Sequence, residues 1–293
     1  MPLVRSFSVG IVDLHGEDRV RFLHGMVTND IEKLEPQKGC HAAMLTTKGK
    51  LLADFVVVNL GPYLSIEIDP ALVEKIRAHL DKHIVMDDVE VRAVTIPALG
   101  VYGDDAAEAI KRAIGLDVAA LPSYAAALGD QVGVVRTPEL RMPGFHVYGN
   151  VAIDGTPLDD AEFEERRIEA GTPRYGVDMG EDRLPIEAGI TDAVSFEKGC
   201  YLGQEVIARA TNLGHINRRL VGLVVDGDPP ATGMKLSSPS KPDAGWVTSS
   251  ARSRRLGKTI ALGYVHRTLW DPGTQLALAD GRTATVSALP FAG

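Results

Sequence analysis

A short segment in the second half of the chain carries the residue types best suited to chemistry. Cys200 lies in the run KGCYLGQE, residues 198–205, two positions after Lys198 and directly after Gly199. A nearby ammonium favours the thiolate form of a cysteine, and a glycine lets a ligand or the backbone approach closely. The pattern therefore predicts a reactive thiol at Cys200. The alternative is a structural cysteine in a tight turn, since cysteine is among the residue types most often buried.

Carboxylates lie upstream of this run. Glu169 belongs to the sequence RIEAG at residues 167–171, and a similar sequence, PIEAG, follows at residues 185–189. From composition alone, Glu169 is interpreted as a solvent-facing acid at the end of a charged helix. Asp54 follows Leu51-Leu52 in a strand-like segment. The alternative for Glu169 is a buried carboxylate that accepts hydrogen bonds from a donor-rich ligand.

The cysteines and histidines do not predict a metal site. Cys40 and His41 are neighbours, and adjacent residues in a strand point to opposite faces, so they rarely bind one ion. His79 and His83 have the i, i+4 spacing of a helical zinc site. No acid or third ligand is placed near them, so a solvated helix face is the better interpretation. Cys40 is predicted to be structural.

The elements that must position these residues fall into two parts. In the first part, strand-like and helix-like segments alternate, which favours an α+β fold with antiparallel sheets. The expected strands cover residues 7–14, 51–60, 63–68, 89–95, 98–102, 132–136 and 145–148, and the expected helices cover residues 17–29, 70–84, 104–114 and 158–170. A further helix is expected to begin near residue 204, beside the thiol.

The C-terminal part has a different pattern. Short β-rich runs follow Arg219 and are separated by Gly, Pro and Asp-Gly turns, of which Asp280-Gly281 is a strong hairpin signal. This pattern predicts a small β-barrel or sandwich. We place the boundary near Leu213-Gly214, which gives domains of residues 1–215 and 216–293.

The composition limits the classes of partner. The 293 residues carry 31 Lys and Arg against 39 Asp and Glu, a formal net charge of −8. An acidic chain gains nothing from the counterion release that drives non-specific nucleic-acid binding, so no nucleic-acid partner is expected. No apolar run reaches the ~20 residues of a membrane-spanning helix, and no secretory signal is visible. With 2 cysteines, a cytoplasmic location is expected.

Taken together, these motifs resemble those of the YgfZ family of folate-binding proteins, whose signature K-G-C-[FY]-x-G-Q-E stands here as KGCYLGQE. That family shares the RIEAG, YG and PIEAG runs with a superfamily that includes the glycine cleavage T-proteins, which are aminomethyltransferases. Further matches lie at residues 18–25, 28–30, 48–54 and 86–89. The resemblance implies a three-lobed ring, with two interleaved α+β lobes and a C-terminal β-barrel around a central folate channel.

The resemblance also implies roles in binding tetrahydrofolate or a one-carbon derivative of it. Glu169 is the implied acceptor for the pterin N–H groups. Lys198 is the implied cation that steadies the glutamate tail, polarises Cys200, or does both. Arg218 is a weaker candidate for the tail, because arginines at a domain edge are usually solvated.

Three more residues have implied places in the folate site. Tyr175 and Tyr201 could stack on the pterin or the aryl ring, and aromatic packing in the core is the alternative for each. Asn29, in the run Thr28-Asn29-Asp30, is implied to organise a turn near the same cavity.

Asp54 marks a departure from the T-protein pattern. T-proteins typically carry two adjacent aspartates here, one of which assists attack by folate N5 on the aminomethyl group. This chain has Ala53-Asp54, and a shift of one residue along a strand turns a side chain to the opposite face. The departure puts aminomethyl transfer in doubt and leaves folate binding untouched.

The resemblance therefore favours a tetrahydrofolate-binding accessory protein. It would act in iron–sulfur cluster assembly or repair, with Cys200 as the redox-active or cluster-contacting group and with iron–sulfur client or assembly proteins as partners. The alternative is a folate-dependent aminomethyl or methyl transferase. A third hypothesis is a scaffold whose channel takes a protein segment. A classical aminomethyltransferase activity is not expected at this point.

Overall fold

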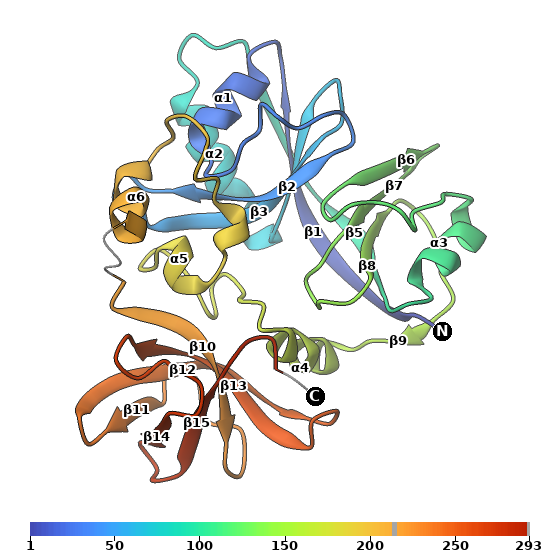
Figure 1. The fold of residues 1–293 in the computed structure, drawn as a ribbon. Helices are drawn as coiled ribbons and strands as arrows, with labels where there is room; N and C mark the ends of the chain where they lie inside the picture. The colour runs from blue at the N-terminus through green and yellow to red at the C-terminus, as the bar shows by residue number, and fades with distance from the viewer. Residues whose placement is uncertain (213–215, 292–293) are drawn as a thin grey trace. The chain divides into compact units, whose positions relative to one another are not determined.

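A computed structural model describes residues 1–212 and 216–291 of the chain (Figure 1). The chain divides into two compact units, of which the first comprises Met1–Leu158 and Asp192–Gln204 and the second comprises Asp159–Thr191 and Glu205–Gly293. The predicted domain boundary near Leu213-Gly214 lies outside the described residues, as does His215. The domain boundary at 215–216 stays a prediction.

A nine-stranded sheet forms the framework of the first unit, in the order β2-β3-β4-β1-β5-β8-β7-β6, with β9 beside β1. Its strands are β1 (Leu3–His15), β2 (Gly39–Leu45), β3 (Leu51–Asn59), β4 (Leu64–Ile68), β5 (Glu90–Tyr102), β6 (Ala126–Gly129), β7 (Val132–Arg136), β8 (Gly144–Tyr148) and β9 (Thr156–Pro157). The pairing is antiparallel except between β1 and β9. The predicted α+β class is confirmed.

The strand β5 is longer than the sequence indicated. Two strands were expected, separated near Pro97, whereas a single strand pairs with β1 from Leu3 opposite Tyr102 to His15 opposite Glu90. Pairing with β8 begins only at Ala98. Pro97 thus lies outside the β8 ladder, in a place where a residue without a backbone N–H is tolerated.

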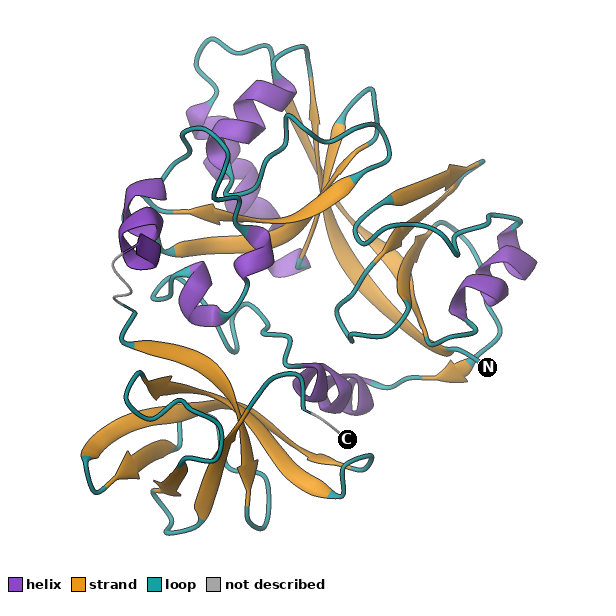
Figure 2. Cartoon of the chain, viewed as in Figure 1, coloured by secondary structure: helices purple, strands orange, loops and turns teal. Residues whose placement is uncertain are grey.

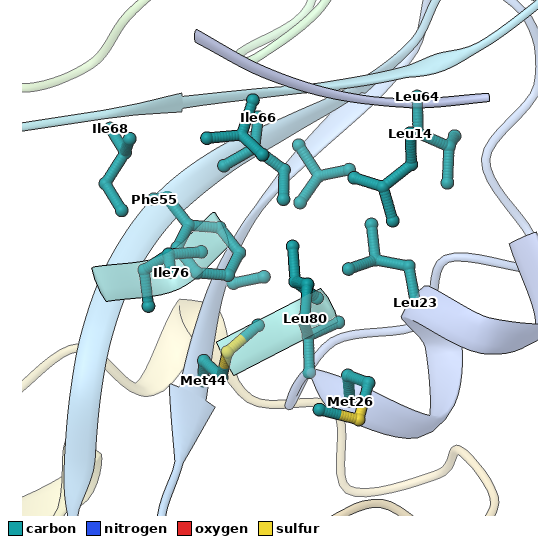
Figure 3. Packing of buried hydrophobic residues seen from close by; sticks show 14 of the residues in the cluster. Leu14, Leu23, Met26, Met44, Phe55, Leu64, Ile66, Ile68, Ile76 and Leu80 are labelled. Atoms are coloured by element: carbon teal, nitrogen blue, oxygen red, sulfur yellow. The ribbon is translucent and has the colours of Figure 1, made fainter. Parts of the chain in front are cut away.

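Helices cover one face of this sheet. They are α1 (Arg19–Met26), α2 (Val73–His83), which follows the 3-10 turn η1 (Pro70–Leu72), and α3 (Ala106–Ile114). Helix α2 buries Val73, Ile76 and Leu80, which recur at the spacing of one helical face. Figure 3 shows this face packed with Phe55 of β3 in the main core. The helix predicted over residues 70–84 is confirmed.

The opposite face of the sheet closes on itself. Val58 of β3, near one end of the strand order, packs with Ala126 of β6 and Val135 of β7 from the other end. Backbone hydrogen bonds also join the two ends, since Gln37 accepts from the Ala126 N–H at 2.9 Å and donates to Asn59 at 2.6 Å. The sheet is therefore curled, and the side chains on its inner face converge.

The second unit contains the barrel and the segment before it. Helix α4 (Asp160–Ala170) begins at Asp159, whose carboxylate accepts from the Glu162 N–H at 2.8 Å, and ends at Gly171 in the left-handed conformation. The short α5 (Pro185–Ala188) follows in the same unit. Of the next two elements, η2 (Thr191–Ala193) lies mostly in the first unit and α6 (Gln204–Asn212) mostly in the second. The predicted charged helix and the helix near residue 204 are both confirmed.

The C-terminal strands form a closed barrel in the order β10-β13-β12-β11-β14-β15. They are β10 (Arg218–Val225), β11 (Lys235–Ser238), β12 (Lys241–Ser253), β13 (Lys258–His266), β14 (Gln275–Leu278) and β15 (Thr283–Ser287). The described residues after α6 form only strands and loops (Figure 2). The predicted C-terminal barrel is confirmed, and the three-lobed ring around a channel stays a prediction.

Among the helices of the described residues, none has the length and apolar character needed to cross a membrane.

Candidate functional site

Asp54 lies on the inner face of the curled sheet. Along β3, Ala53, Phe55 and Val57 are buried in the core shared with α2, and Asp54 points to the other face because side chains alternate along a strand. An aspartate at position 53 would lie inside the apolar core, where Ala53 is 0% exposed. The departure at Ala53 therefore removes no carboxylate from the polar face, and the role of Asp54 stays a prediction.

His41 connects Asp54 to a second carboxylate. His41 of β2 is opposite Val56 of β3, which makes it a diagonal neighbour of Asp54 on the same face. Its Nε2 lies 3.1 Å from Asp54 Oδ2, and its Nδ1 lies 3.1 Å from Asp192 Oδ2. The Tyr124 hydroxyl donates to Asp192 Oδ2 at 3.0 Å. We call these four side chains, Asp54, His41, Asp192 and Tyr124, the His41 cluster.

The two carboxylates determine the charge of the imidazole. Burial alone would lower the pKa of His41, but the hydrogen bonds to Asp192 and Asp54 and their negative charges raise it to about 9. The imidazolium in turn lowers the pKa of Asp192 against the effect of burial. Burial and the Asp192 charge raise the pKa of Tyr124, so its hydroxyl stays a donor. At neutral pH, both ring N–H groups of His41 can donate.

The turn after α1, which contains Thr28 and Asn29, holds the backbone of this cluster by hydrogen bonds. The Asn29 amide donates to the His41 carbonyl at 2.7 Å and to the Asp192 carbonyl at 3.0 Å. The Thr28 hydroxyl donates to the Ala193 carbonyl at 2.6 Å. Asn29 thus lies beside the cluster, and its amide nitrogen positions the backbone of two cluster residues.

Lys198 is directed toward the backbone. Its ammonium donates to the carbonyl oxygens of His24 at 2.5 Å, Val27 at 2.8 Å and Asn29 at 2.9 Å, and it lies 5.1 Å from the centre of the Tyr201 ring. Burial lowers the pKa of Lys198 to about 8. Three hydrogen bonds use the three N–H groups of an ammonium. In this structure, Lys198 therefore secures the end of α1 and the turn after it.

Cys200 is exposed, whereas Cys40 is half-buried. Burial raises the pKa of the Cys40 thiol to about 12, with the Lys198 ammonium acting in the opposite direction. The glycines of KGCYLGQE differ in role. Gly203 has φ +84°, and a Cβ there would lie 2.5 Å from the Thr46 carbonyl, whereas a Cβ on Gly199 would meet no atom within 4 Å. Space beside Cys200 is therefore open.

Glu169 lies in the second unit with its carboxylate buried. The residue is 7% exposed. Its Oε1 accepts from the Ser253 hydroxyl at 2.5 Å, and its Oε2 accepts from Arg255 Nε at 2.8 Å. These contacts exclude the solvent-facing acid that composition alone suggests, and they connect the end of α4 to the barrel.

The other two predicted residues of the second unit are half-buried. Tyr175 forms an isolated β-bridge with Met179. Arg218 donates to Asp243 Oδ2 at 2.5 Å, and its guanidinium lies 5.3 Å from the centre of the Trp246 ring. The roles in folate binding that the resemblance implies for Tyr175 and Arg218 stay predictions.

The structure thus groups the predicted site residues by unit. The first unit holds Asn29, Asp54, Lys198, Cys200 and Tyr201, and the second holds Glu169, Tyr175 and Arg218. That these residues share one folate site, as the resemblance implies, stays a prediction. Within the described residues, no group of three or more His, Cys, Asp or Glu side chains has the geometry of a metal site.

Sequence reasoning missed three members of the His41 cluster. His41 was considered only as a metal ligand beside Cys40, and neither Asp192 nor Tyr124 stood out. Recognising residues 39–45 as a strand would have placed His41 on the face of Asp54, because the two runs must pair around the turn at residues 46–50.

Comparisons with known proteins agree with this architecture. Residues 6–141 match the family described as the GCVT N-terminal domain, and residues 218–292 match the glycine cleavage T-protein C-terminal barrel domain. Similar curated proteins include the aminomethyltransferase of Geobacillus kaustophilus, 30% identical over 88% of this chain and 77% of that protein. The aminomethyltransferase of Bacillus subtilis is 27% identical over 91% of this chain and 80% of that protein.

A solved structure also has this fold. The crystal structure of glycine cleavage system aminomethyltransferase T from Bartonella henselae aligns with a TM-score of 0.88 at 22% sequence identity, covering 99% of this chain and 86% of that chain. The chain is therefore similar to this aminomethyltransferase in fold, in addition to its sequence matches with the two families.

Proposed function

Because this chain belongs to the glycine cleavage T-protein family of aminomethyltransferases, we propose that it binds a reduced folate and transfers a one-carbon unit to or from it. The observation that carries the proposal is the placement of Asp54. The chain retains a carboxylate on the polar inner face of β3, held by His41 at 3.1 Å. The aspartate that it lacks relative to the T-protein pattern falls in the core.

A carboxylate in this place supplies general-base chemistry. An amine N–H becomes more acidic as its nitrogen attacks a one-carbon unit, and an anionic oxygen within hydrogen-bond reach accepts that proton. Asp54 is the residue to which we assign this role. We assign Glu169, Tyr175, Tyr201 and Arg218 to the binding of the folate, in keeping with the resemblance described above. Asn29 and Lys198 contribute by holding the backbone around the cluster.

Turnover of a reduced folate tests the proposal. The chain, incubated with tetrahydrofolate and an aminomethyl donor, should form methylene-tetrahydrofolate catalytically, with the amino group of the donor released as ammonia. Asp54→Asn should lower the turnover rate about 100-fold, because an amide cannot take up the proton, while a calorimetric folate titration gives an unchanged affinity. Asp130→Asn, an exposed acid in the turn between β6 and β7, is the matched control with unchanged turnover. Product formation by the unsubstituted chain no faster than in buffer would exclude the proposal.

The exposed thiol favours a second candidate function. Cys200 is solvent-exposed and stands in KGCYLGQE, the run that resembles the YgfZ signature. This candidate is a folate-binding accessory role in iron–sulfur cluster assembly or repair, with client or assembly proteins as partners. It requires the thiol, whereas one-carbon transfer by Asp54 does not.

The variant Cys200→Ser separates the two candidates. If the accessory role holds, cells that carry Cys200→Ser in place of the natural chain lose iron–sulfur enzyme activity, and cells that carry Asp54→Asn retain it. If one-carbon transfer is the whole function, the purified Cys200→Ser chain keeps its turnover, and the cells keep their iron–sulfur enzymes. Measuring folate turnover and one iron–sulfur enzyme for both variants decides between them.

A further inference from the structure

The Asp54 carboxylate is held from one side only. Within the described residues, the Asp54 side chain makes one hydrogen bond, which joins its Oδ2 to His41 Nε2 at 3.1 Å. No hydrogen bond to Oδ1 occurs in that part of the chain, and the side chain is 21% exposed. One oxygen is therefore fixed, and the other is available to a ligand.

From this arrangement, we propose that His41 is a positioning residue that orients the Asp54 carboxylate for one-carbon transfer, and that Asp192 and Tyr124 hold His41 in place. The inference rests on the proposed function, because it concerns the base of that reaction. It adds residues that do not touch the folate, and whose effect is transmitted through the hydrogen bond to Asp54 Oδ2.

The orientation of His41 is over-determined. Asp192 Oδ2 lies 3.1 Å from Nδ1 and accepts from Tyr124 at 3.0 Å. The Asn29 amide holds the carbonyl groups of both His41 and Asp192. A ring fixed at Nδ1 presents Nε2 in one direction, so the position of Asp54 Oδ2 follows from the anchor at Asp192.

The protonation of His41 sets the pH range of this arrangement. The titratable groups that face the ring are Asp54 from β3, Asp192 from η2 and Tyr124 from the segment before β6, whose ring centre lies 6.0 Å away. The pKa of His41 is raised to about 9. A neutral imidazole has one N–H and can donate to only one of the two carboxylates. Above pH 9, Asp54 and Asp192 therefore compete for it.

The test is His41→Gln in the turnover assay. A glutamine amide cannot bridge the two carboxylates as the ring does, so we expect kcat to fall about tenfold. The KM for tetrahydrofolate should stay within about threefold, since the binding residues are untouched. The alkaline fall in kcat near pH 9 should be present in the natural chain and absent in the variant. His266→Gln, on a half-buried barrel residue outside the cluster, is the control with unchanged kcat and pH profile.

An NMR titration keeps this inference distinct from the proposed function. The His41 imidazole signals should titrate near pH 9 in the natural chain and at lower pH in Asp54→Asn, because one carboxylate charge is lost. If the natural chain shows no turnover, the proposed function fails, and the inference fails with it even if the titration reveals the bridge. If turnover is present, an unchanged kcat and pH profile in His41→Gln overturns the inference alone. A rise in the KM for tetrahydrofolate in His41→Gln without a change in kcat would likewise contradict a positioning role.

Discussion

Replacement of Asp178 by alanine is expected to lower the free energy of unfolding of the second unit by about 3–5 kcal/mol. The Asp178 side chain is 0% exposed and pairs with Arg167, which is 3% exposed, at 2.8 Å. Its Oδ1 accepts from the hydroxyls of Thr248 at 2.5 Å and Ser249 at 2.7 Å. Without the carboxylate, a buried guanidinium loses a charged partner and two buried hydroxyls lose their acceptor. The segment before α5 would then detach from β12.

Urea unfolding followed by tryptophan fluorescence measures this effect in the right unit. The chain has 2 tryptophans, Trp246 and Trp270, and both belong to the second unit. The matched control is Asp243→Ala on β12 of the same unit, where the carboxylate is 67% exposed and pairs with Arg218. An exposed pair contributes at most about 1 kcal/mol. Equal losses in Asp178→Ala and Asp243→Ala would contradict the importance of the buried pair.

The elements predicted correctly are those whose own sequence carries the pattern. Strand β3 alternates buried and partly exposed residues along LLADFVVVN, and α2 has apolar residues on one face. In both cases, the local periodicity coincides with the side that packs in the core. The C-terminal barrel was predictable for the same reason, since turn residues separate short β-rich runs.

Strand β2 shows where that reasoning ends. Its sequence GCHAAML contains glycine and alanine, which are depleted in strands, and pairing with β3 supplies what local preference does not. The missed strand hid the role of His41, because the face on which a side chain lies is defined only once the strand is known.

The segment around Asp192 could not be placed from sequence for a different reason. It has only the 3-10 turn η2, and its position depends on hydrogen bonds from Thr28 and Asn29, more than 160 residues earlier. The motif located Lys198 but not its partners. The Lys198 ammonium binds three carbonyl oxygens because the folded backbone at the end of α1 brings them together.

Replacement of His146 by leucine should destabilise the first unit by about 3–5 kcal/mol. His146 of β8 lies between Glu67, which hydrogen-bonds to Nδ1, and Glu139, whose Oε1 lies 2.8 Å from Nε2. The hydroxyls of Tyr148 and Tyr102 donate to the same two glutamates. Removing the imidazolium takes away the positive charge that lies between the two glutamates on the inner side of the sheet.

Far-UV circular dichroism during urea unfolding reports both units, and tryptophan fluorescence reports only the second, because the first unit has no tryptophan. The difference between the two signals therefore gives the unfolding of the first unit. The control is His83→Leu near the end of α2, where the ring contacts only the His79 carbonyl among the hydrogen bonds described, and a change below about 1 kcal/mol is expected. Adding Glu67→Gln and Glu139→Gln to His146→Leu should restore part of the stability, since the repulsion between buried acids is removed. No recovery in the triple variant would show that packing, not charge, sets the loss.

The sign of the pH dependence follows from the direction of the His146 shift. Burial would lower the pKa of His146, but the charges of Glu67 and Glu139 raise it to about 10, above the ordinary value of 6.5. The folded state therefore binds a proton that the unfolded state releases, and this stabilisation is complete below pH 6.5 and is lost as the pH rises through 10. His146→Leu should flatten the stability curve across that window. The pH-dependent stabilisation that remains in His146→Leu should be lost as the pH rises through 9, because the pKa of His41 is about 9. A variant that lacks both histidines should lose this remaining pH dependence as well.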